Sequence, residues 1–309
     1  MGSRLAFGSA LKFSQHHSPA LPLCTARCVL PVATKSRVGM SHAPLMTMTT
    51  PQTTPQVCTL DCTDTIMKVK GSIPRLYLGV LEDRLGVQEG ALPGVSEQDL
   101  LDSFGTSMKK RSREVPCFGY GVMSSEEWWG VVVRDTFRGA GVAEESLQGV
   151  FDEVFDELYH NVFTSLPTWE LVPGAKDVIR DLRAWCRQDG GPLALGVVSN
   201  FDERLHPLLK NLGVYESFDF VLTSRECGSE KPDSHMFREA LKRAGASEGS
   251  KGVHIGDRFS KDVLGARRAG WDAVLITGKP IREEEKGVEH VRVGDLISVP
   301  GALGLVVGR

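Results

Sequence analysis

The feature that most constrains the fold of this sequence is an alternation between short apolar runs and segments with helical periodicity. The apolar runs are typical of β-strands and lie at 57–60, 193–198, 220–223, 252–255 and 273–276. Helical periodicity predicts helices at about 174–187, 203–211, 234–244 and 261–269. Repeated strand–helix units are typical of a parallel sheet covered by helices. We therefore predict an α/β fold with a doubly wound, mostly parallel sheet.

The pattern changes between residues 69 and 169, where β-type runs vanish and amphipathic helical patterns replace them. Ser124 and Glu127 predict a capping box at the start of a helix that carries Trp128 and Trp129. We expect both tryptophans to pack in a core rather than to hold a ligand. A following helix is predicted from apolar residues at helical spacing, namely Leu147, Phe151, Val154 and Leu158. Residues 69–169 are thus predicted to form a helical domain inserted into a core made of 56–68 and 170–309.

The N-terminal segment differs from the rest in charge. Residues 1–60 contain no Asp or Glu, and their basic residues are Arg4, Lys12, Arg27, Lys35 and Arg37. An acid-free, Ser/Thr-rich and mildly basic segment predicts a disordered transit peptide over 1–55, with the chloroplast favoured over the mitochondrion because Arg is sparse. The alternative is a disordered tail without a targeting role. Internal starts would leave a cytoplasmic form; they are available at Met40, Met46 and Met48.

Composition excludes several classes of function. Residues 61–309 carry 31 basic and 39 acidic side chains, a net charge of −8 that disfavours nucleic-acid binding. No apolar run approaches the roughly 20 residues that cross a bilayer, so we expect no membrane partner. The seven cysteines are scattered without a CxxC pair, which indicates reduced thiols rather than a disulfide framework or a zinc site. The oligomeric state stays open.

Polar residues that are able to take part in catalysis or ligand binding follow the predicted strands in four places. These are Asp61 to Thr65, Ser199-Asn200, Lys231-Pro232, and Gly256-Asp257 with Asp262 five residues further on. Each alone is typical of a turn or a helix cap. Because the carboxyl ends of parallel strands form one edge of a sheet, we expect the four groups to lie close together.

The residue types at this edge favour phosphoryl transfer. Asp61, Asp257 and Asp262 would repel one another without a cation, and carboxylate oxygens suit Mg²⁺. Lys231 and the Ser199 hydroxyl supply donors for an anion that also contacts the metal. A carboxylate in such a site is able to attack phosphorus and form an aspartyl-phosphate that water then hydrolyses.

These motifs resemble those of the haloacid dehalogenase (HAD) superfamily over residues 56–278. The chain shows DxxxT at Asp61 to Thr65, a strand-end Ser199, KP at Lys231-Pro232, and GDxxxxD at Gly256 to Asp262. The segments VVSNFDERL, FDFVLTSRECGSEKPD and LVPGAKDVIRDLR, together with EEWW, are similar to the branch of rhythmically-expressed-gene-2-like and HAD-domain-containing-protein-3-like sequences. The resemblance implies a Rossmann-like core and a helical C1 cap that closes over the active site.

The resemblance also implies a role for each motif residue. Asp61 would be the nucleophile and a Mg²⁺ ligand, together with the main-chain carbonyl of Thr63, Asp257 and Asp262, the last of which would alternatively orient Lys231. The phosphate of a small phosphorylated metabolite would be bound by Ser199, Asn200 and Lys231. Thr65 would steady the first loop.

Thr63 is the clearest departure from the family pattern. HAD phosphatases usually carry Asp two residues after the nucleophile, where it protonates the leaving group and then activates water. General acid–base catalysis contributes about 10²–10⁴-fold, so Thr63 predicts a slow phosphatase. It also keeps open a catalytically impaired phosphate-binding or regulatory protein. Asp64 is adjacent, but a shift of one residue is expected to turn its side chain elsewhere.

Other functions fit the motifs less well. Dehalogenation of 2-haloacids would use the same Asp nucleophile but needs no metal, which leaves the acidic pair Asp257 and Asp262 unexplained. A response-regulator receiver has its acidic pair before its lysine, the reverse of the order here. A further alternative is that all four groups are structural turns and caps without a catalytic role. Their occurrence at four predicted strand ends in this order disfavours it. The substrate is not readable from the sequence. The aromatic residues Phe104, Phe118, Tyr120 and Trp128 are candidates for lining its pocket, but core packing is the favoured role for them.

Overall fold

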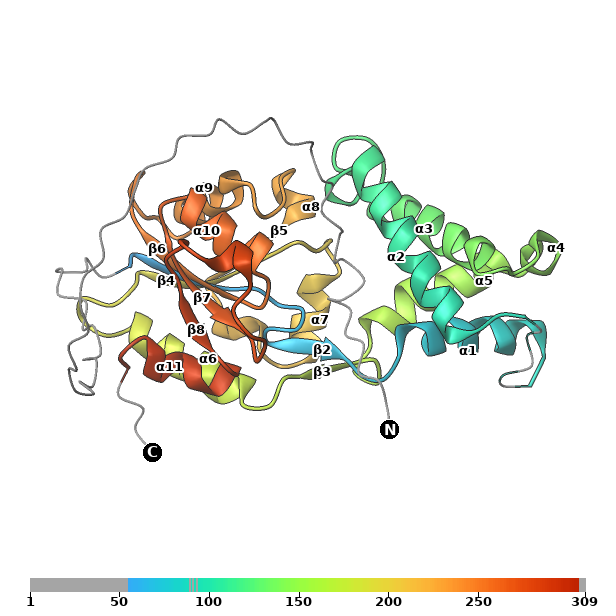
Figure 1. The fold of residues 1–309 in the computed structure, drawn as a ribbon, viewed down its shortest axis with the longest axis horizontal. Helices are drawn as coiled ribbons and strands as arrows, with labels where there is room; N and C mark the ends of the chain where they lie inside the picture. The colour runs from blue at the N-terminus through green and yellow to red at the C-terminus, as the bar shows by residue number, and fades with distance from the viewer. Residues whose placement is uncertain (1–54, 89, 91, 93, 306–309) are drawn as a thin grey trace, which may run out of the picture. The chain divides into compact units, whose positions relative to one another are not determined.

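The computed structural model describes residues 55–88, 90, 92 and 94–305, and its centre is a six-stranded parallel sheet (Figure 1). The strand order is β5–β4–β1–β6–β7–β8, and every neighbouring pair is parallel. The strands are β1 (Val57–Leu60), β4 (Ala194–Ser199), β5 (Phe220–Thr223), β6 (Gly252–Gly256), β7 (Asp272–Ile276) and β8 (Val291–Val293). The predicted parallel sheet is confirmed, and β8 adds an edge strand that the sequence did not indicate.

Helices cover both faces of the sheet, which confirms the doubly wound architecture (Figure 1). One face is covered by α6 (Ala175–Cys186), α7 (Leu205–Asn211) and α11 (Val299–Ala302), and the other by α9 (Ser234–Arg243) and α10 (Leu264–Arg268). The short helix α8 (Ser224–Cys227) follows β5. A π-helical turn, Phe259–Val263, leads into α10, so the helix predicted at 261–269 is irregular at its start.

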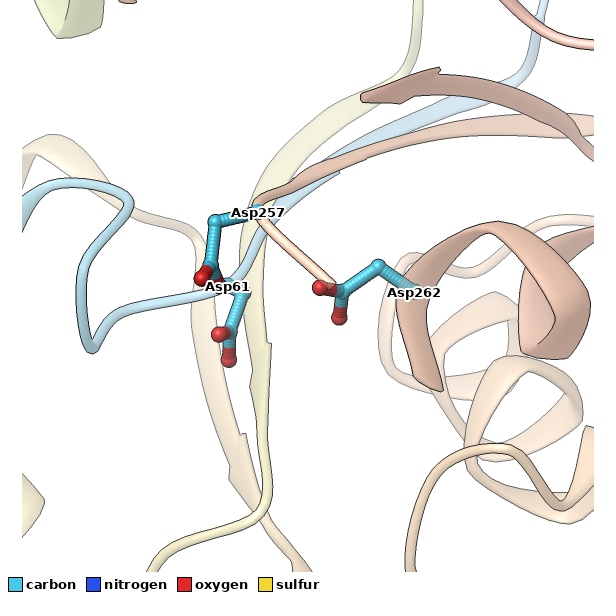
Figure 2. A group of neighbouring side chains, drawn as sticks. All are labelled: Asp61, Asp257 and Asp262. Carbon is cyan, nitrogen blue, oxygen red and sulfur yellow. The ribbon is translucent and has the colours of Figure 1, made fainter. Parts of the chain in front are cut away.

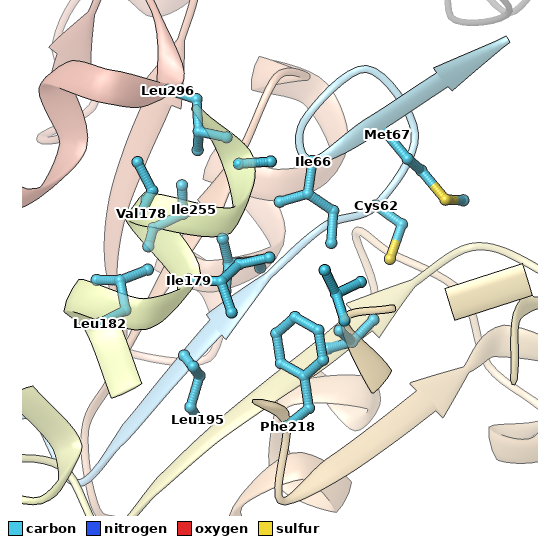
Figure 3. Packing of buried hydrophobic residues seen from close by; sticks show 14 of the residues in the cluster. Cys62, Ile66, Met67, Val178, Ile179, Leu182, Leu195, Phe218, Ile255 and Leu296 are labelled. Atoms are coloured by element: carbon cyan, nitrogen blue, oxygen red, sulfur yellow. The ribbon is translucent and has the colours of Figure 1, made fainter. Parts of the chain in front are cut away.

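The two apolar cores arise from the alternation of side chains along buried strands. On β4, Leu195 and Val197 join the core beneath α6 and α7, whereas Ala194 and Val198 join the core beneath α9 and α10. Figure 3 shows the first of these cores, in which Ile179 and Leu182 of α6 lie near Leu195. Because both faces are buried, these strands read as continuous apolar runs, which is why they were predictable.

A helical unit forms the insertion between β1 and β4. Its helices are α1 (Ile73–Leu85), α2 (Glu97–Glu114), α3 (Ser125–Gly139), α4 (Glu144–Leu147) and α5 (Phe151–Asp156). The predicted capping box is present, since the Ser124 hydroxyl accepts from the Glu127 N–H and the Glu127 carboxylate accepts from the Ser124 N–H. Apolar residues of these helices form a separate core, so we refer to this unit as the cap.

The single helix predicted from Leu147 to Leu158 is wrong. The chain leaves the helical path after α4 and turns at Gly149, which has φ = 92°, before α5 begins at Phe151. A positive φ is accessible to glycine without steric cost, so Gly149 permits the turn. The predicted apolar residues are nevertheless all buried in the cap core: Leu147 lies on α4, Phe151 and Val154 lie on α5, and Leu158 lies in the π-helical turn that follows.

A two-stranded antiparallel ribbon joins the cap to the core. Its strands are β2 (Met67–Val69) and β3 (Trp169–Leu171), which pair with Met67 opposite Leu171. The cap helices begin at Ile73, and the last helical turn ends at Thr164. The sequence did not indicate the ribbon, since three-residue strands carry too little periodicity to be recognised.

The predicted leader, residues 1–55, lies outside the described residues except for Pro55. Across the part of the chain that the structure describes, no helix combines the length and apolar character needed to span a membrane.

Gly196 allows a test of the packing beneath the candidate site. A Cβ atom on Gly196 would lie 2.2–2.6 Å from ring carbons of Phe220. We expect Gly196→Ala to lower the free energy of unfolding by about 1–3 kcal/mol in urea titrations, the usual cost of overpacking a core. The same substitution in a Phe220→Leu background should cost much less; equal costs in both backgrounds would show that this contact is not the cause.

Candidate active site

The candidate site lies at the carboxyl ends of the three central strands, β4, β1 and β6. Asp61 follows β1, Ser199 ends β4, and Asp257 follows β6. Strand β1 lies at the point where the order of connections reverses, with β4 on one side and β6 on the other. Open α/β sheets characteristically bind ligands at such a switch point.

Lys231 reaches this edge by a route that differs from the prediction. It does not follow a strand directly, because α8 and a loop separate it from the end of β5 at Thr223. The Asn200 side chain holds that loop: its Oδ1 accepts from the Lys231 N–H at 2.7 Å, and its Nδ2 donates to the Lys231 carbonyl at 2.9 Å. Asn200, predicted as a phosphate ligand, thus positions the main chain of Lys231.

The Lys231 ammonium lies between two carboxylates. Its Nζ is 2.8 Å from Asp61 Oδ1 and 2.7 Å from Asp262 Oδ1, and the side chain is almost completely buried. Burial by itself would lower the pKa of Lys231, but Asp262 and Asp61 outweigh it and raise the pKa to about 12. Lys231 is therefore a fixed positive charge at neutral pH.

Asp61 is held by one of its two carboxylate oxygens. The Ser199 hydroxyl donates to Asp61 Oδ1 at 2.8 Å, on the same oxygen that Lys231 contacts. Within the described residues, Asp61 Oδ2 receives no hydrogen bond. The arrangement fixes the carboxylate and leaves one oxygen available as a nucleophile or a ligand.

Asp61, Asp257 and Asp262 gather at one point, as Figure 2 shows. Each offers a carboxylate oxygen, and these oxygens lie within 4.8 Å of one another. Asp257 Oδ1 is buried without a hydrogen-bond partner in the described part of the chain. Burial, followed by the negative charges of Asp262 and Asp61, raises the pKa of Asp257 well above its ordinary value. A buried carboxylate oxygen with no donor, beside other carboxylates, fits a site for a divalent cation.

Asp262 is engaged differently from Asp257. Its Oδ1 accepts from Lys231 Nζ, and its Oδ2 accepts from the Arg258 N–H at 2.8 Å. Burial would raise the pKa of Asp262, but Lys231 and His254 lower it below the ordinary value. Of the two roles predicted for Asp262, this geometry favours orientation of Lys231 over direct contact with a metal.

His254 and Thr59 belong to this network and were missed by the sequence analysis. His254 lies on β6 opposite Thr59 on β1, and its Nδ1 is 2.8 Å from the Thr59 hydroxyl. Its Nε2 is 3.2 Å from Asp262 Oδ1, and burial, followed by the charge of Lys231, lowers its pKa. A neutral His254 accepting from Thr59 and donating to Asp262 satisfies both ring nitrogens. The sequence did contain a signal for this pair, because Thr59 and His254 are polar residues within two otherwise apolar strands.

The loop after Asp61 departs from one expectation. Asp64 has φ = 61°, and both Asp64 and Thr63 line the cavity above Asp61. Asp64 therefore lies at the cavity with a left-handed backbone, although a shift of one residue was expected to turn its side chain elsewhere. Thr65 is buried and its N–H donates to the Cys62 carbonyl, but its hydroxyl has no partner among the described residues. The loop is steadied by main-chain bonds rather than by the Thr65 hydroxyl.

The cap supplies the far wall of this cavity. Phe104 and Phe118 line it, whereas Tyr120 is exposed on the surface and Trp128 is packed in the cap core. Both tryptophans are buried in the cap core as expected, and Trp129 reaches the cavity as well. That side chain lines the cavity and donates from Nε1 to Asp202 Oδ2 at 2.7 Å.

The described fold and site define a hydrolase with a Rossmann-like core and a helical cap. Residues 55–270 match the family model for haloacid dehalogenase-like hydrolases. The chain belongs to this family, and the resemblance drawn from the four motifs is confirmed.

Within the family, the chain is similar to a particular branch. It is 39% identical to haloacid dehalogenase-like hydrolase domain-containing protein 3 of Bos taurus, over 58% of this chain and 67% of that protein. It is 29% identical to the rhythmically expressed gene 2 protein of Drosophila melanogaster, over 72% of this chain and 84% of that protein. A glyceraldehyde 3-phosphate phosphatase of Methanothermobacter thermautotrophicus is 35% identical over 42% of this chain and 54% of that protein.

Solved structures agree with this fold. A 2-haloacid dehalogenase from Pseudomonas syringae aligns with a TM-score of 0.53 and 24% identity, covering 81% of this chain and 98% of that one. At this identity the likeness shows a common fold and does not transfer an activity.

Asp257 provides a test of the cation site that does not depend on activity. Because its folded-state pKa is raised, its charged form is disfavoured in the fold, and this cost is full above that pKa and disappears as the pH falls to the unfolded value. We expect Asp257→Asn to raise the Tm at neutral pH without divalent cations, by about 2–4 °C per kcal/mol of repulsion removed. Differential scanning calorimetry in EDTA measures this shift.

The exposed Asp152→Asn variant on α5 removes the same charge away from the site and should leave the Tm almost unchanged. Adding MgCl₂ should raise the Tm of the wild type more than that of Asp257→Asn, because a ligand that binds only the folded state stabilises it. An equal rise in both proteins would contradict the assignment of Asp257 to the cation.

Proposed function

We propose that this protein is a Mg²⁺-dependent phosphatase that hydrolyses a small phosphorylated metabolite through an aspartyl-phosphate on Asp61. The observation that carries the proposal is the arrangement around Asp61: one oxygen is held by Lys231 and Ser199, and the other receives no donor from the described residues. The carboxylates of Asp257 and Asp262 lie beside it. The partial similarity to a protein named as a phosphatase supports the same class of reaction.

In the first step, Asp61 Oδ2 attacks the phosphorus atom of the substrate. A new P–O bond to Asp61 forms, and the bond to the leaving oxygen breaks, with the electron pair going to that oxygen. Lys231 Nζ and the Ser199 hydroxyl, both at Asp61, donate to the phosphate oxygens as charge redistributes.

In the second step, water attacks the phosphorus of the aspartyl-phosphate, and the P–O bond to Asp61 breaks with its electron pair returning to the carboxylate. The protons of the water leave with the inorganic phosphate. The cation would be held by Asp61, Asp257 and the main-chain carbonyl of Thr63, and Mg²⁺ there supplies neutralisation of phosphate charge. Asp262 and His254 keep Lys231 in place through the contacts described above.

Dehalogenation is the rival chemistry for the same nucleophile. The partnerless oxygen of Asp257 argues against it, because displacing halide from a carbon atom gives a cation no task. A catalytically impaired phosphate-binding protein is the second candidate, and the observation that favours it is Thr63, which has no acidic proton to donate.

Asp61→Asn tests the proposal. We expect the full-length wild type to release phosphate from a panel of small phosphate esters in MgCl₂ and not in EDTA. Asp61→Asn should reduce release to the level of the blank, because an amide is a poor nucleophile toward phosphorus. Malachite-green assays give the rates, and circular dichroism verifies that the variant is folded.

Asp152→Asn serves as the matched control and should retain the wild-type rate. Unchanged turnover by Asp61→Asn would refute the nucleophile assignment. No release by folded wild-type protein from any ester, with Mg²⁺-dependent phosphate binding by calorimetry, would instead identify the phosphate-binding protein. Chloride release from a 2-haloacid would identify the dehalogenase.

A further inference from the structure

The cavity above Asp61 has two chemically different halves. Its volume is about 100 Å³, and its core side carries the groups that bind phosphate, including Asp61, Ser199 and Lys231. Every residue that the cap contributes to the lining is aromatic or aliphatic, among them Phe104, Met108, Trp129, Phe155 and Leu158. The cavity thus has a polar end, where the proposed mechanism puts the phosphate, and an apolar end formed by the cap.

Polar atoms on the cap side are almost all engaged within the protein. Trp129 Nε1 donates to Asp202, and the Tyr159 hydroxyl is 2.8 Å from Ser125 Oγ. Among the described cap residues that line the cavity, the Tyr77 hydroxyl is the one side-chain group without a hydrogen-bond partner. A leaving group with several hydroxyls would lose its bonds to water here without replacement, at a cost for each unpaired group.

The cations near the cavity do not alter this division. Arg204 is paired with Asp202 through both Nε and Nη2, at 2.9 and 2.7 Å, so its charge is already neutralised. Lys231, Arg258 and Lys261 all come from the core: Lys231 lies in the loop after α8, and Arg258 and Lys261 lie between β6 and α10. The positive charges therefore lie on the core side of the cavity, at its polar end. The described cap residues that line the cavity include no cationic side chain that would bind a second anion.

Thr63 constrains the leaving group independently of the cavity wall. With Thr two residues after the nucleophile, the departing oxygen receives no proton from the usual position. An ordinary alcohol is about as weak an acid as water, so it is a poor leaving group when it departs without a proton. A phenol, like the tyrosine side chain, has a pKa of about 10 and departs as a far more stable anion.

Asp64 is an acidic residue that could protonate the leaving group where Thr63 cannot, since it lines the cavity. Its negative charge raises the pKa of Asp257, after burial and the charges of Asp262 and Asp61. Asp64 is one residue further from Asp61 than the position of the usual acid, and the Asp64→Asn variant below tests whether it takes over that role.

We propose that the substrate is an aryl phosphate monoester, in which the phosphate is attached to a ring hydroxyl. The inference rests on the proposed phosphatase function and specifies its substrate class. The ring would contact aromatic side chains that already pair with one another, such as Phe104 and Trp129, whose stacked rings lie 6.5 Å apart. The whole cavity measures about 100 Å³, against roughly 150 Å³ for an apolar cavity known to hold one benzene molecule, so a single ring is the largest apolar group that it suits. Asp61 attacks phosphorus, the P–O(aryl) bond breaks, and phenolate leaves with the electron pair.

Four substrates test separately whether the cap binds a ring and whether the reaction needs a good leaving group. Phenyl phosphate has a ring and a good leaving group, and cyclohexyl phosphate has a similar apolar body with a poor one. Acetyl phosphate has a good leaving group without a ring, and glycerol 1-phosphate has neither property. We expect phenyl phosphate to give the highest kcat/KM. Cyclohexyl phosphate should have a similar KM with kcat lower by at least about 100-fold, the low end of what a general acid contributes.

Acetyl phosphate should be hydrolysed with a KM at least tenfold above that of phenyl phosphate, and glycerol 1-phosphate should be the poorest of the four. If glycerol 1-phosphate matches phenyl phosphate in kcat/KM, the substrate class is wrong although the phosphatase function stands. If acetyl phosphate has the lower KM, the aromatic wall does not bind the leaving group. If none of the four is hydrolysed while other esters are, the inference fails alone; if no ester is hydrolysed, the proposed function fails with it.

Two variants of the first loop test the leaving-group argument. Thr63→Asp should raise kcat for cyclohexyl phosphate at least tenfold and change that for phenyl phosphate less than threefold, because only the poor leaving group needs a proton. Asp64→Asn should leave the ratio of the two rates unchanged. A selective loss of cyclohexyl phosphate turnover in Asp64→Asn would show that Asp64 is the acid and would overturn the argument.

Phe155→Ala tests the cavity wall. Phe155 is only partly buried and stacks on Phe151, so its removal should leave the fold intact. We expect KM for phenyl phosphate to rise about tenfold and the constants for glycerol 1-phosphate to stay within twofold. Tyr120→Ala is the matched control, since Tyr120 is 53% exposed and does not line the cavity. Equal effects of Phe155→Ala on both substrates would contradict a ring site in the cap.

Discussion

The buried contact of Lys231 with Asp61 and Asp262 is the interaction on which the rest of the site depends. An ammonium group out of contact with water is unstable unless opposite charges surround it, and each carboxylate here needs the lysine for the same reason. The three residues come from three separate parts of the chain and meet only when β1 and β6 pair and the loop after α8 is held by Asn200. Because the contact requires the sheet, its ends and the loop together, it ties the chemistry to the completed fold.

Asp257 does not take part in the ion pairs that Lys231 makes with Asp61 and Asp262. Asp262 has donors on both oxygens, whereas Asp257 Oδ1 is buried with none in the described part of the chain. The two acidic residues of one short motif therefore differ in their contacts: Asp262 is paired with Lys231, whereas Asp257 keeps a buried oxygen that fits a cation ligand. The His254–Thr59 pair reinforces the contacts of Asp262 from within the sheet, where two polar side chains satisfy each other between apolar neighbours.

The cap changes what this site is able to accept. Its own apolar core makes it a separate packing unit, and the β2–β3 ribbon links it to the core directly after the first loop. The same helices that bury Trp128 turn Trp129 toward the cavity, where its ring faces the space above Asp61 and its N–H is bound by Asp202. The cavity therefore has an apolar wall on the cap side opposite a charged floor on the core side.

The sequence by itself determined the sheet, its parallel character and the four groups of polar residues. Strands such as 194–199 are buried on both faces and are therefore apolar throughout, and helix starts such as Ser124 to Glu127 are encoded locally. Only the tertiary structure decided the difference in contacts between Asp257 and Asp262, the part played by His254, the direction of Asp64 and the composition of the cavity wall. Most of these depend on contacts between residues that are far apart in the chain, and the loop feature depends on one backbone angle at Asp64. Neither kind of feature produces a periodic pattern in the sequence.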